Sequence, residues 1–149
     1  MKSALLVPPL LLILLEACSS PVYLEDLTRP ALAWNRARGL CGSWIAVDAD
    51  GGLWRGNDGC ENENGRSGLK AAGKGDPTKV EALRQAFQTL PVNAGPQRSD
   101  CLGNLFTFSR WTAATKIESR ACALGSSYDD LTGLEEPHLT VARGFLALP

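Results

Sequence analysis

Residues 68–75 read GLKAAGKG, which has the G-x-x-x-x-G-K spacing of a phosphate-binding loop. Such a loop works because a buried strand leads into it and because a Ser or Thr hydroxyl after the lysine holds magnesium. Here the preceding residues, ENENGRS, are polar, Gly75 stands at the hydroxyl position, and Asp76 adds a negative charge. We therefore expect no nucleotide and no cofactor, and we predict a flexible loop over residues 60–75.

Five cysteines could form covalent bonds: Cys18, Cys41, Cys60, Cys101 and Cys122. The four that follow Cys18 are an even set, which in an exported chain is typical of two disulfides with three possible connectivities. A zinc site is the other use of four cysteines. It is disfavoured because none of the spacings is C-x-x-C and because an exported thiol cluster would oxidise.

Turn chemistry favours one pairing for the first two of these cysteines. The dipeptide Asp50-Gly51 is a preferred two-residue hairpin turn, since both central positions need positive φ. With this turn, Cys41 lies opposite Cys60, and Val47 lies opposite Trp54 on a half-buried face. The sequence therefore predicts a Cys41–Cys60 bridge at the base of a hairpin.

A second hairpin is predicted over residues 102–121. Placing Cys101 opposite Cys122 sets Phe106 opposite Ile117 around a short loop at residues 110–113. We therefore predict a Cys101–Cys122 bridge, with bridges that cross between the two halves of the chain as the alternative. Each sequential bridge closes a loop that should contribute about 3 kcal/mol of stability.

The amino terminus has the pattern of a signal peptide over residues 1–17, MKSALLVPPLLLILLEA. A single basic residue, Lys2, precedes an apolar run that ends at the small residue Ala17, directly before Cys18. The run is too short for a permanent membrane span, which needs about 20 apolar residues. We therefore predict export with removal of this segment.

The residues Leu15-Glu16-Ala17-Cys18, followed by Ser19, resemble the lipobox of bacterial lipoproteins. The resemblance implies cleavage before Cys18 and a lipid anchor, with palmitate-type acyl chains, on its sulfur. Ser19, rather than aspartate, implies delivery to an outer membrane, with the protein facing the periplasm. Glu16 departs from the small or apolar residue usual at that position, and an ordinary secretory signal cut nearby is the alternative.

Charge and length limit the remaining possibilities. Removal of residues 1–17 takes away Lys2 and Glu16 together, so the formal net charge stays at −1. No basic excess exists to attract nucleic acid or to support membrane binding through a polybasic patch. We predict a lipidated tether over residues 18–30 and one globular domain over residues 31–149.

The clearest helix is predicted to begin at Asp76, which can cap its first turn, and to end before Pro91. Pro77 suits the first helical position, and apolar residues recur at helical spacing through to Leu90. A second helix is predicted over residues 24–38, with residues 31–38 as its dependable part, because Leu27, Ala31 and Trp34 also recur at helical spacing.

The carboxyl-terminal segment is also predicted to be helical. Residues 132–135, TGLE, have capping-box spacing before an apolar tail. The β-branched residues Thr140 and Val141 leave a strand as the alternative.

These elements predict an α+β fold in which two disulfide-closed hairpins, able to join in one four-stranded sheet, carry two or three helices on one face. Their order over residues 45–148, a strand pair with Gly-Gly at its turn, a helix, a strand pair and an apolar tail, resembles emfourin-type inhibitors of thermolysin-like metalloproteases. The resemblance implies a protease inhibitor. It identifies no inhibitory residue, and the predicted disulfides depart from it.

Candidates for catalysis are few. His138 is the only histidine, so a histidine-paired metal site is excluded and one imidazole base is left. No serine lies in a G-x-S-x-G setting. Asp48 and Asp50 lack the spacing of a calcium loop, and Asp129 and Asp130 are adjacent acidic residues that we expect to face solvent.

Arg110 and Trp111 fall at the predicted tip of the second hairpin, where the core cannot easily reach them. Exposed Trp and Arg are typical contact anchors, so we predict that this pair touches an envelope or secreted protein partner. A tryptophan folded back on a neighbouring loop is the alternative.

Together these features predict a lipid-anchored, non-enzymatic binding or structural module. A protease-inhibitor-like module is the second hypothesis, and a small hydrolase using His138 is the third.

Overall fold

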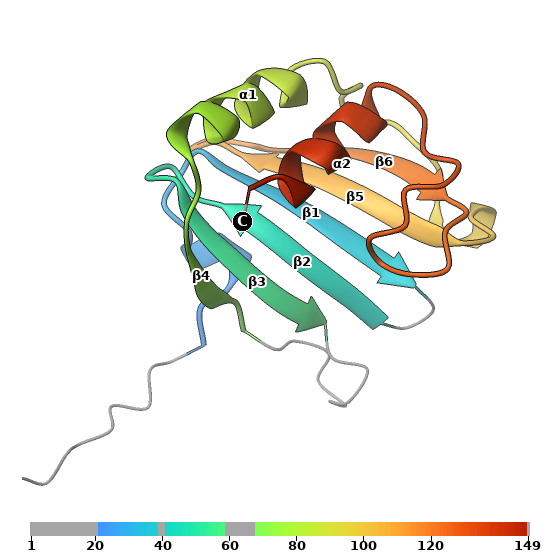
Figure 1. Cartoon of the computed structure of the whole chain (residues 1–149), viewed down its shortest axis with the longest axis horizontal. Coiled ribbons are helices and arrows are strands. Elements are labelled where there is room, and N and C mark those ends of the chain that lie inside the picture. Colours follow the sequence, from blue (N-terminus) through green and yellow to red (C-terminus); the bar gives the residue numbers. More distant parts are fainter. Residues whose placement is uncertain (1–20, 39–40, 59–67, 149) are drawn as a thin grey trace, which may run out of the picture.

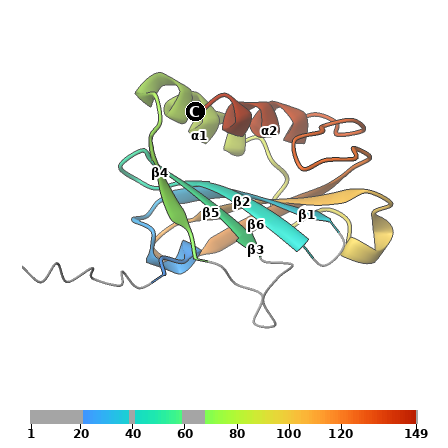
Figure 2. The ribbon, with the colours of Figure 1, turned by 60° about the horizontal axis from the view of Figure 1, so that its bottom comes forward.

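A computed structural model describes residues 21–38, 41–58 and 68–148. One antiparallel sheet has the strand order β4-β3-β2-β1-β5-β6 (Figure 1). Its strands are β1 (Ala31–Arg38), β2 (Cys41–Val47), β3 (Gly52–Asp58), β4 (Lys70–Lys74), β5 (Asn104–Trp111) and β6 (Lys116–Ala123). Two α-helices, α1 (Pro77–Phe87) and α2 (His138–Leu146), cover one face, and two short 3-10 helices are η1 (Leu24–Asp26) and η2 (Arg98–Asp100) (Figure 2).

The predicted α+β class, with helices on one face, is confirmed, but the sheet has six strands where two hairpins were expected to make four. The predicted signal segment and Cys18 lie outside the described residues, so export and lipidation stay predictions. None of the described helices is long and apolar enough to cross a membrane.

The main core lies between the sheet and the two helices. Trp34, at the centre of β1, is fully buried. Its ring lies 5.1 Å from that of Phe106 and 5.9 Å from those of Phe108 and Phe145, measured between ring centroids. Aromatic groups at these separations pack with favourable edge and offset contacts, so this cluster joins β1, β5 and α2.

A second, smaller core covers the opposite face of the sheet. Residues 21–30 lie against that face, seen as the blue segment below the sheet in Figure 2. The buried side chains there are Leu27, Ala31, Ala33, Ala46, Leu69 and Trp111. Because β1 is central in the sheet and apolar layers lie on both of its faces, it is buried through most of its length.

The prediction of a helix over residues 31–38 is wrong, because this segment forms β1. A strand buried on both faces shows little polar alternation, and an alanine-rich run then imitates helical spacing. Here Leu32 and Trp34 belong to the main core while Ala31 and Ala33 belong to the second, which is the period of two expected of a strand.

The turn between β2 and β3 differs from the predicted two-residue turn. The Asp48 amide donates to the Gly52 carbonyl at 3.0 Å, which leaves a loop at residues 49–51. Gly51 closes this loop with a φ of 77°, a conformation that glycine adopts without strain. The Asp48 carboxylate accepts hydrogen bonds from the Gly52 amide at 2.7 Å and from the Trp54 indole at 2.8 Å.

This longer loop shifts the register by one residue. Val47 pairs with Leu53, and Trp54 pairs with Ala46. A shift of one residue moves a side chain to the other face of a sheet. Trp54 therefore packs against the second core, whereas the prediction had placed it on the same face as Val47.

The hairpin β5–β6 has the predicted strands but a different register. Phe106 pairs with Ala121, and Ile117 pairs with Arg110. The loop therefore lies at residues 112–115. Each residue of β5 pairs with a residue that is four positions further along the chain than predicted. Trp111 is a strand residue that is 6% exposed, so its predicted position at an exposed tip is wrong.

The predicted Cys101–Cys122 disulfide is present, with the two Cα atoms 5.4 Å apart. It does not close the base of the ladder, because Cys122 pairs with Leu105 in the sheet. Instead it ties the segment after η2 to β6. Cys41 is also disulfide-bonded, and since Cys60 lies outside the described residues, the Cys41–Cys60 bridge stays a prediction.

The predicted helix after Asp76 is confirmed as α1, and the Asp76 carboxylate accepts from the amides of Thr78 and Lys79. The carboxyl-terminal segment is the predicted helix, although α2 begins at His138 with no side-chain cap, beyond the expected capping box. Residues 70–74, predicted to be loop, form the exposed edge strand β4, while residues 59–67 lie outside the description.

Candidate functional site

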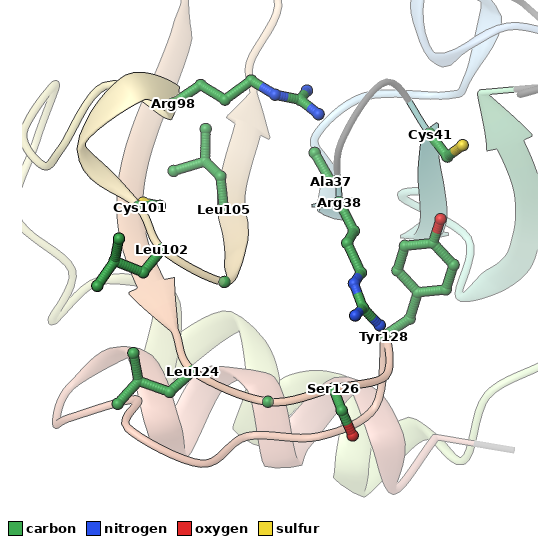
Figure 3. A pocket seen from close by; sticks show the side chains of 12 residues that line it. Ala37, Arg38, Cys41, Arg98, Cys101, Leu102, Leu105, Leu124, Ser126 and Tyr128 are labelled. Atoms are coloured by element: carbon green, nitrogen blue, oxygen red, sulfur yellow. The ribbon is translucent and has the colours of Figure 1, made fainter.

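A cleft of about 730 Å³ opens where β1 ends and β5 begins. We call it the sheet-end cleft (Figure 3). Its lining comes from β1, β2, η2, the turn between η2 and β5, β5 itself, and the loop after β6. These residues are Ala37, Arg38, Cys41, Arg98, Cys101, Leu102, Gly103, Leu105, Leu124, Gly125, Ser126 and Tyr128. Its volume falls within the range usual for ligand sites.

The cleft has two chemically different sides. Figure 3 shows Leu102, Leu105 and Leu124 on one side and Arg38 with Tyr128 on the other. Leu102 is 99% exposed and Leu124 is 64% exposed, so the apolar side projects into solvent. Both sides carry a disulfide-bonded cysteine, Cys41 and Cys101, which restrains the backbone around the cleft.

Arg38 and Arg98 are both exposed, and neither takes part in an ion pair with any of the described residues. They are the charged side chains of the described lining. Arginine presents several donors in a planar fork that matches a carboxylate or phosphate. The cleft can therefore offer to an anion two guanidinium groups that no carboxylate of the described residues engages.

Two buried polar side chains hold the loop at residues 125–130, which forms one wall. The Asn104 side-chain amide donates to the carbonyls of Gly125 at 3.2 Å and Ser127 at 2.8 Å. The buried Arg36 guanidinium pairs with the Asp129 carboxylate. Burial lowers the pKa of Arg36, and the charge of Asp129 opposes that effect.

The turn before β5 needs glycine at one position. A Cβ atom added to Gly103 would collide with the Ala123 carbonyl oxygen. This close approach brings the start of β5 against the end of β6, beside the Cys101–Cys122 bridge. Leu102 therefore stands on a turn that is braced by both a disulfide and backbone packing.

The one histidine, His138, lies elsewhere, at the start of α2, where it contacts β6. His138 Nε2 is 2.9 Å from the Ser119 hydroxyl, and its ring centroid lies 5.5 Å from that of Phe108. Burial lowers the pKa of His138. No carboxylate contacts the imidazole among the described residues, so the third member of a catalytic triad is missing from that part of the chain.

Access to this pair is also restricted. Ser119 is 2% exposed, and the hollow beside it has a volume of about 30 Å³. That volume is far below the range of substrate pockets. The Ser119–His138 pair can share a proton, but the hollow that the described residues form beside Ser119 is too small to hold a substrate.

The predicted contact residues are separated from the cleft. Arg110 lies beside the small hollow near Ser119, and Trp111 is buried on the opposite face of the sheet. The pair therefore loses the exposed position on which the prediction of partner contact rested. Among the described residues, no group of three or more metal-ligating side chains occurs.

Sequence reasoning missed Arg38, Arg98 and the leucines of the cleft. Arg38 was assigned to a helix, Arg98 lay in a segment with no predicted element, and Leu102 was the first residue of the predicted second hairpin. The pattern carried one usable signal, since Leu102 directly follows a cysteine and precedes Gly103, which is typical of a turn held by a disulfide.

Comparison with known proteins adds no relative. No protein-family model matches the chain, and neither a curated protein nor a solved structure matches it.

Proposed function

We propose that this protein is an exported, lipid-anchored binding module without enzymatic activity, and that it holds its partner in the sheet-end cleft. The observation that carries the proposal is that Leu102, 99% exposed, shares one hollow with Arg38 and Arg98, which form no ion pair within the described part of the chain. A single exposed leucine is common on the surface of a folded protein and does not by itself indicate a binding site. Several apolar and cationic groups gathered in a cleft are typical of a contact site.

Rigid walls favour binding at this position. Ordering of loops and side chains opposes association, so a surface that is already ordered loses less free energy when it binds. Asn104 and Arg36 fasten one wall, and the Cys101–Cys122 bridge fastens the turn that carries Leu102. The cleft is therefore suited to recognition without a large conformational change.

Absence of chemistry in the cleft favours binding over catalysis. Its described lining includes two arginines, a tyrosine and a serine, but no histidine or carboxylate that could act as a general base at neutral pH. The residues with the best catalytic geometry, Ser119 and His138, lie outside it and are closed to substrate.

The anchor is tested by replacing the predicted lipid site. Cys18→Ser should move the protein from the detergent phase to the aqueous phase, because acyl chains supply the membrane affinity. Metabolic labelling with a palmitate analogue should mark the wild type only. A variant that still partitions with detergent would contradict lipid anchoring.

The cleft is tested by photo-crosslinking in the native envelope. A benzoylphenylalanine at position 102 should crosslink a protein partner, because that side chain lies in the cleft. The matched control is the same probe at Val92, a 60% exposed apolar residue on a loop outside the cleft lining. Equal products at both positions, or none at position 102, would contradict a partner in the cleft.

A further inference from the structure

Resting on the proposed function, we propose that the occupant of the sheet-end cleft is a polypeptide segment of a partner protein in which an acidic residue stands beside a large apolar one. The cleft's two sides make separate demands on a ligand. One side offers the Arg38 guanidinium, and the other offers exposed leucines with Arg98 above them. A segment that combines both features satisfies both sides at once.

The cationic side requires an anion. Arg38 reaches the hollow from β1 and Arg98 reaches it from η2 on the opposite wall, and neither has a carboxylate partner among the described residues. Neighbouring acids are engaged elsewhere: Asp129 pairs with Arg36, and Asp130 accepts from the amides of Ser126 and Thr132. An incoming Asp or Glu side chain can therefore form charge-assisted hydrogen bonds with either arginine.

The apolar side requires a side chain that adds to Leu102 and Leu124. These leucines are 99% and 64% exposed, so most of their surface remains to be covered. Covering it is favourable in proportion to the apolar area removed from water. A Leu, Ile, Met or Phe next to the acidic residue would reach this side while the carboxylate faces the arginines.

The form of the site favours a polypeptide over a membrane surface. A bilayer is flat and cannot fill a hollow of about 730 Å³, whereas a chain can lie in it and continue into solvent at both ends. Electrostatic binding to anionic lipid usually needs four or more clustered basic residues. The described cleft has two, on a chain with a net charge of −1.

The test uses the exported protein with Cys18→Ser, selected against a phage library of random dodecapeptides. Enriched sequences are then synthesised with a fluorescein label, and affinity is measured by fluorescence polarisation at low and high sodium chloride. We expect enrichment of Asp or Glu adjacent to Leu, Ile, Met or Phe, and weaker binding at high salt because salt screens exposed charges.

The variants Arg38→Gln with Arg98→Gln should weaken peptide binding by about tenfold or more, since each removes a charged hydrogen-bond donor. Leu102→Ser should weaken it independently of salt. The matched control is Arg143→Gln, which removes an exposed arginine of α2 that lies outside the cleft. It should leave affinity unchanged, and all four side chains are exposed, so folding should be retained.

Three outcomes would overturn the inference. One is a library without enriched acidic and apolar sequences, and another is peptide binding that ignores the arginine and leucine variants. The third is arginine-dependent binding to phosphatidylglycerol vesicles in place of peptides, which would identify a lipid surface as the occupant. If crosslinking from position 102 still captures a protein in any of these cases, the proposed function stands and only the acidic and apolar character of the partner is wrong.

Discussion

The Ser119–His138 pair and the sheet-end cleft lie in different parts of the molecule and differ in almost every physical respect. The pair has the residue types of a catalytic site at hydrogen-bond distance, 2.9 Å, but it is enclosed between β6, α2 and the ring of Phe108. The cleft is open and large, with exposed arginines and leucines, but it has no acid or base suited to catalysis among its described residues.

This difference separates a structural hydrogen bond from a surface that can recognise a partner. A buried hydroxyl must find a hydrogen-bond partner, and His138 supplies one to Ser119. An exposed arginine has no such need, so its lack of an ion pair has no cost in water. The pair is therefore explained by folding alone, whereas the gathering of the cleft residues is not.

Removing the disulfide that holds the turn at one wall of the cleft should have the largest effect on the free energy of unfolding. Removing the Cys101–Cys122 bridge with Cys101→Ser and Cys122→Ser should cost about 3 kcal/mol, because the unfolded chain gains the freedom of an open loop. Denaturant unfolding measures this loss. Peptide affinity at the cleft should fall as well, since Leu102 follows Cys101, and unchanged unfolding would show that packing alone holds this turn.

The two hairpins indicate how much of the fold could be predicted from the sequence. Both pairs of strands were expected, yet both registers were wrong. In β2–β3 the error was one residue, so Trp54 moved to the other face. In β5–β6 the error was an even number of positions, so Phe106 and Ile117 still share the predicted face. The alternation of side chains along each strand is therefore predictable from the sequence, whereas the turn length that sets the register is not.

The reason lies in contacts that a pattern cannot reveal. The β2–β3 loop is selected by the Asp48 carboxylate, which binds the amide of Gly52 and the indole of Trp54. The cleft depends on the pairing of β1 with β5, two segments far apart in the chain. Because residues 31–38 imitate a helix, no local rule could bring Arg38 near Leu105 or Arg98.

Substitution of Asn104, which holds the loop at one wall of the cleft, should have the next largest effect on the free energy of unfolding. Asn104→Ala removes the donor for two carbonyls, and since Gly125 is buried its carbonyl is left without that partner. We expect a loss of about 2 kcal/mol in unfolding free energy. Asn104→Asp should cost more, because a buried carboxylate would face the same two carbonyl oxygens. If both variants were as stable as wild type, the loop at residues 125–130 would be held by the Arg36 ion pair and the Asp130 hydrogen bonds, without a contribution from Asn104.

The Ser119–His138 pair should have a smaller effect, confined to stability. His138→Ala removes the partner of the buried Ser119 hydroxyl, which should cost about 1 kcal/mol. Thermal unfolding measures this change. Peptide affinity and crosslinking from position 102 should stay unchanged, because the cleft does not include His138. A variant of normal stability that has lost a cellular activity would instead favour the hydrolase hypothesis.

The smallest expected effect is the pH dependence that His138 gives to stability. Burial lowers the pKa of the folded imidazole below its ordinary value of about 6.5. The unfolded chain then binds a proton at a higher pH than the folded chain does, so the free energy of unfolding rises with pH between the two pKa values.

The stabilising contribution of His138 is fully present above pH 6.5 and is lost as the pH falls through the folded pKa. The Ser119 hydroxyl can accept as well as donate, so the loss comes from charging a half-buried ring. Unfolding free energies of wild type and His138→Gln should therefore converge as the pH falls below about 6.5 and through the lowered pKa of the folded imidazole. A constant difference across that interval would mean that the imidazole titrates alike in the folded and unfolded chains, and that the site is more open to water than the 2% exposure of Ser119 indicates.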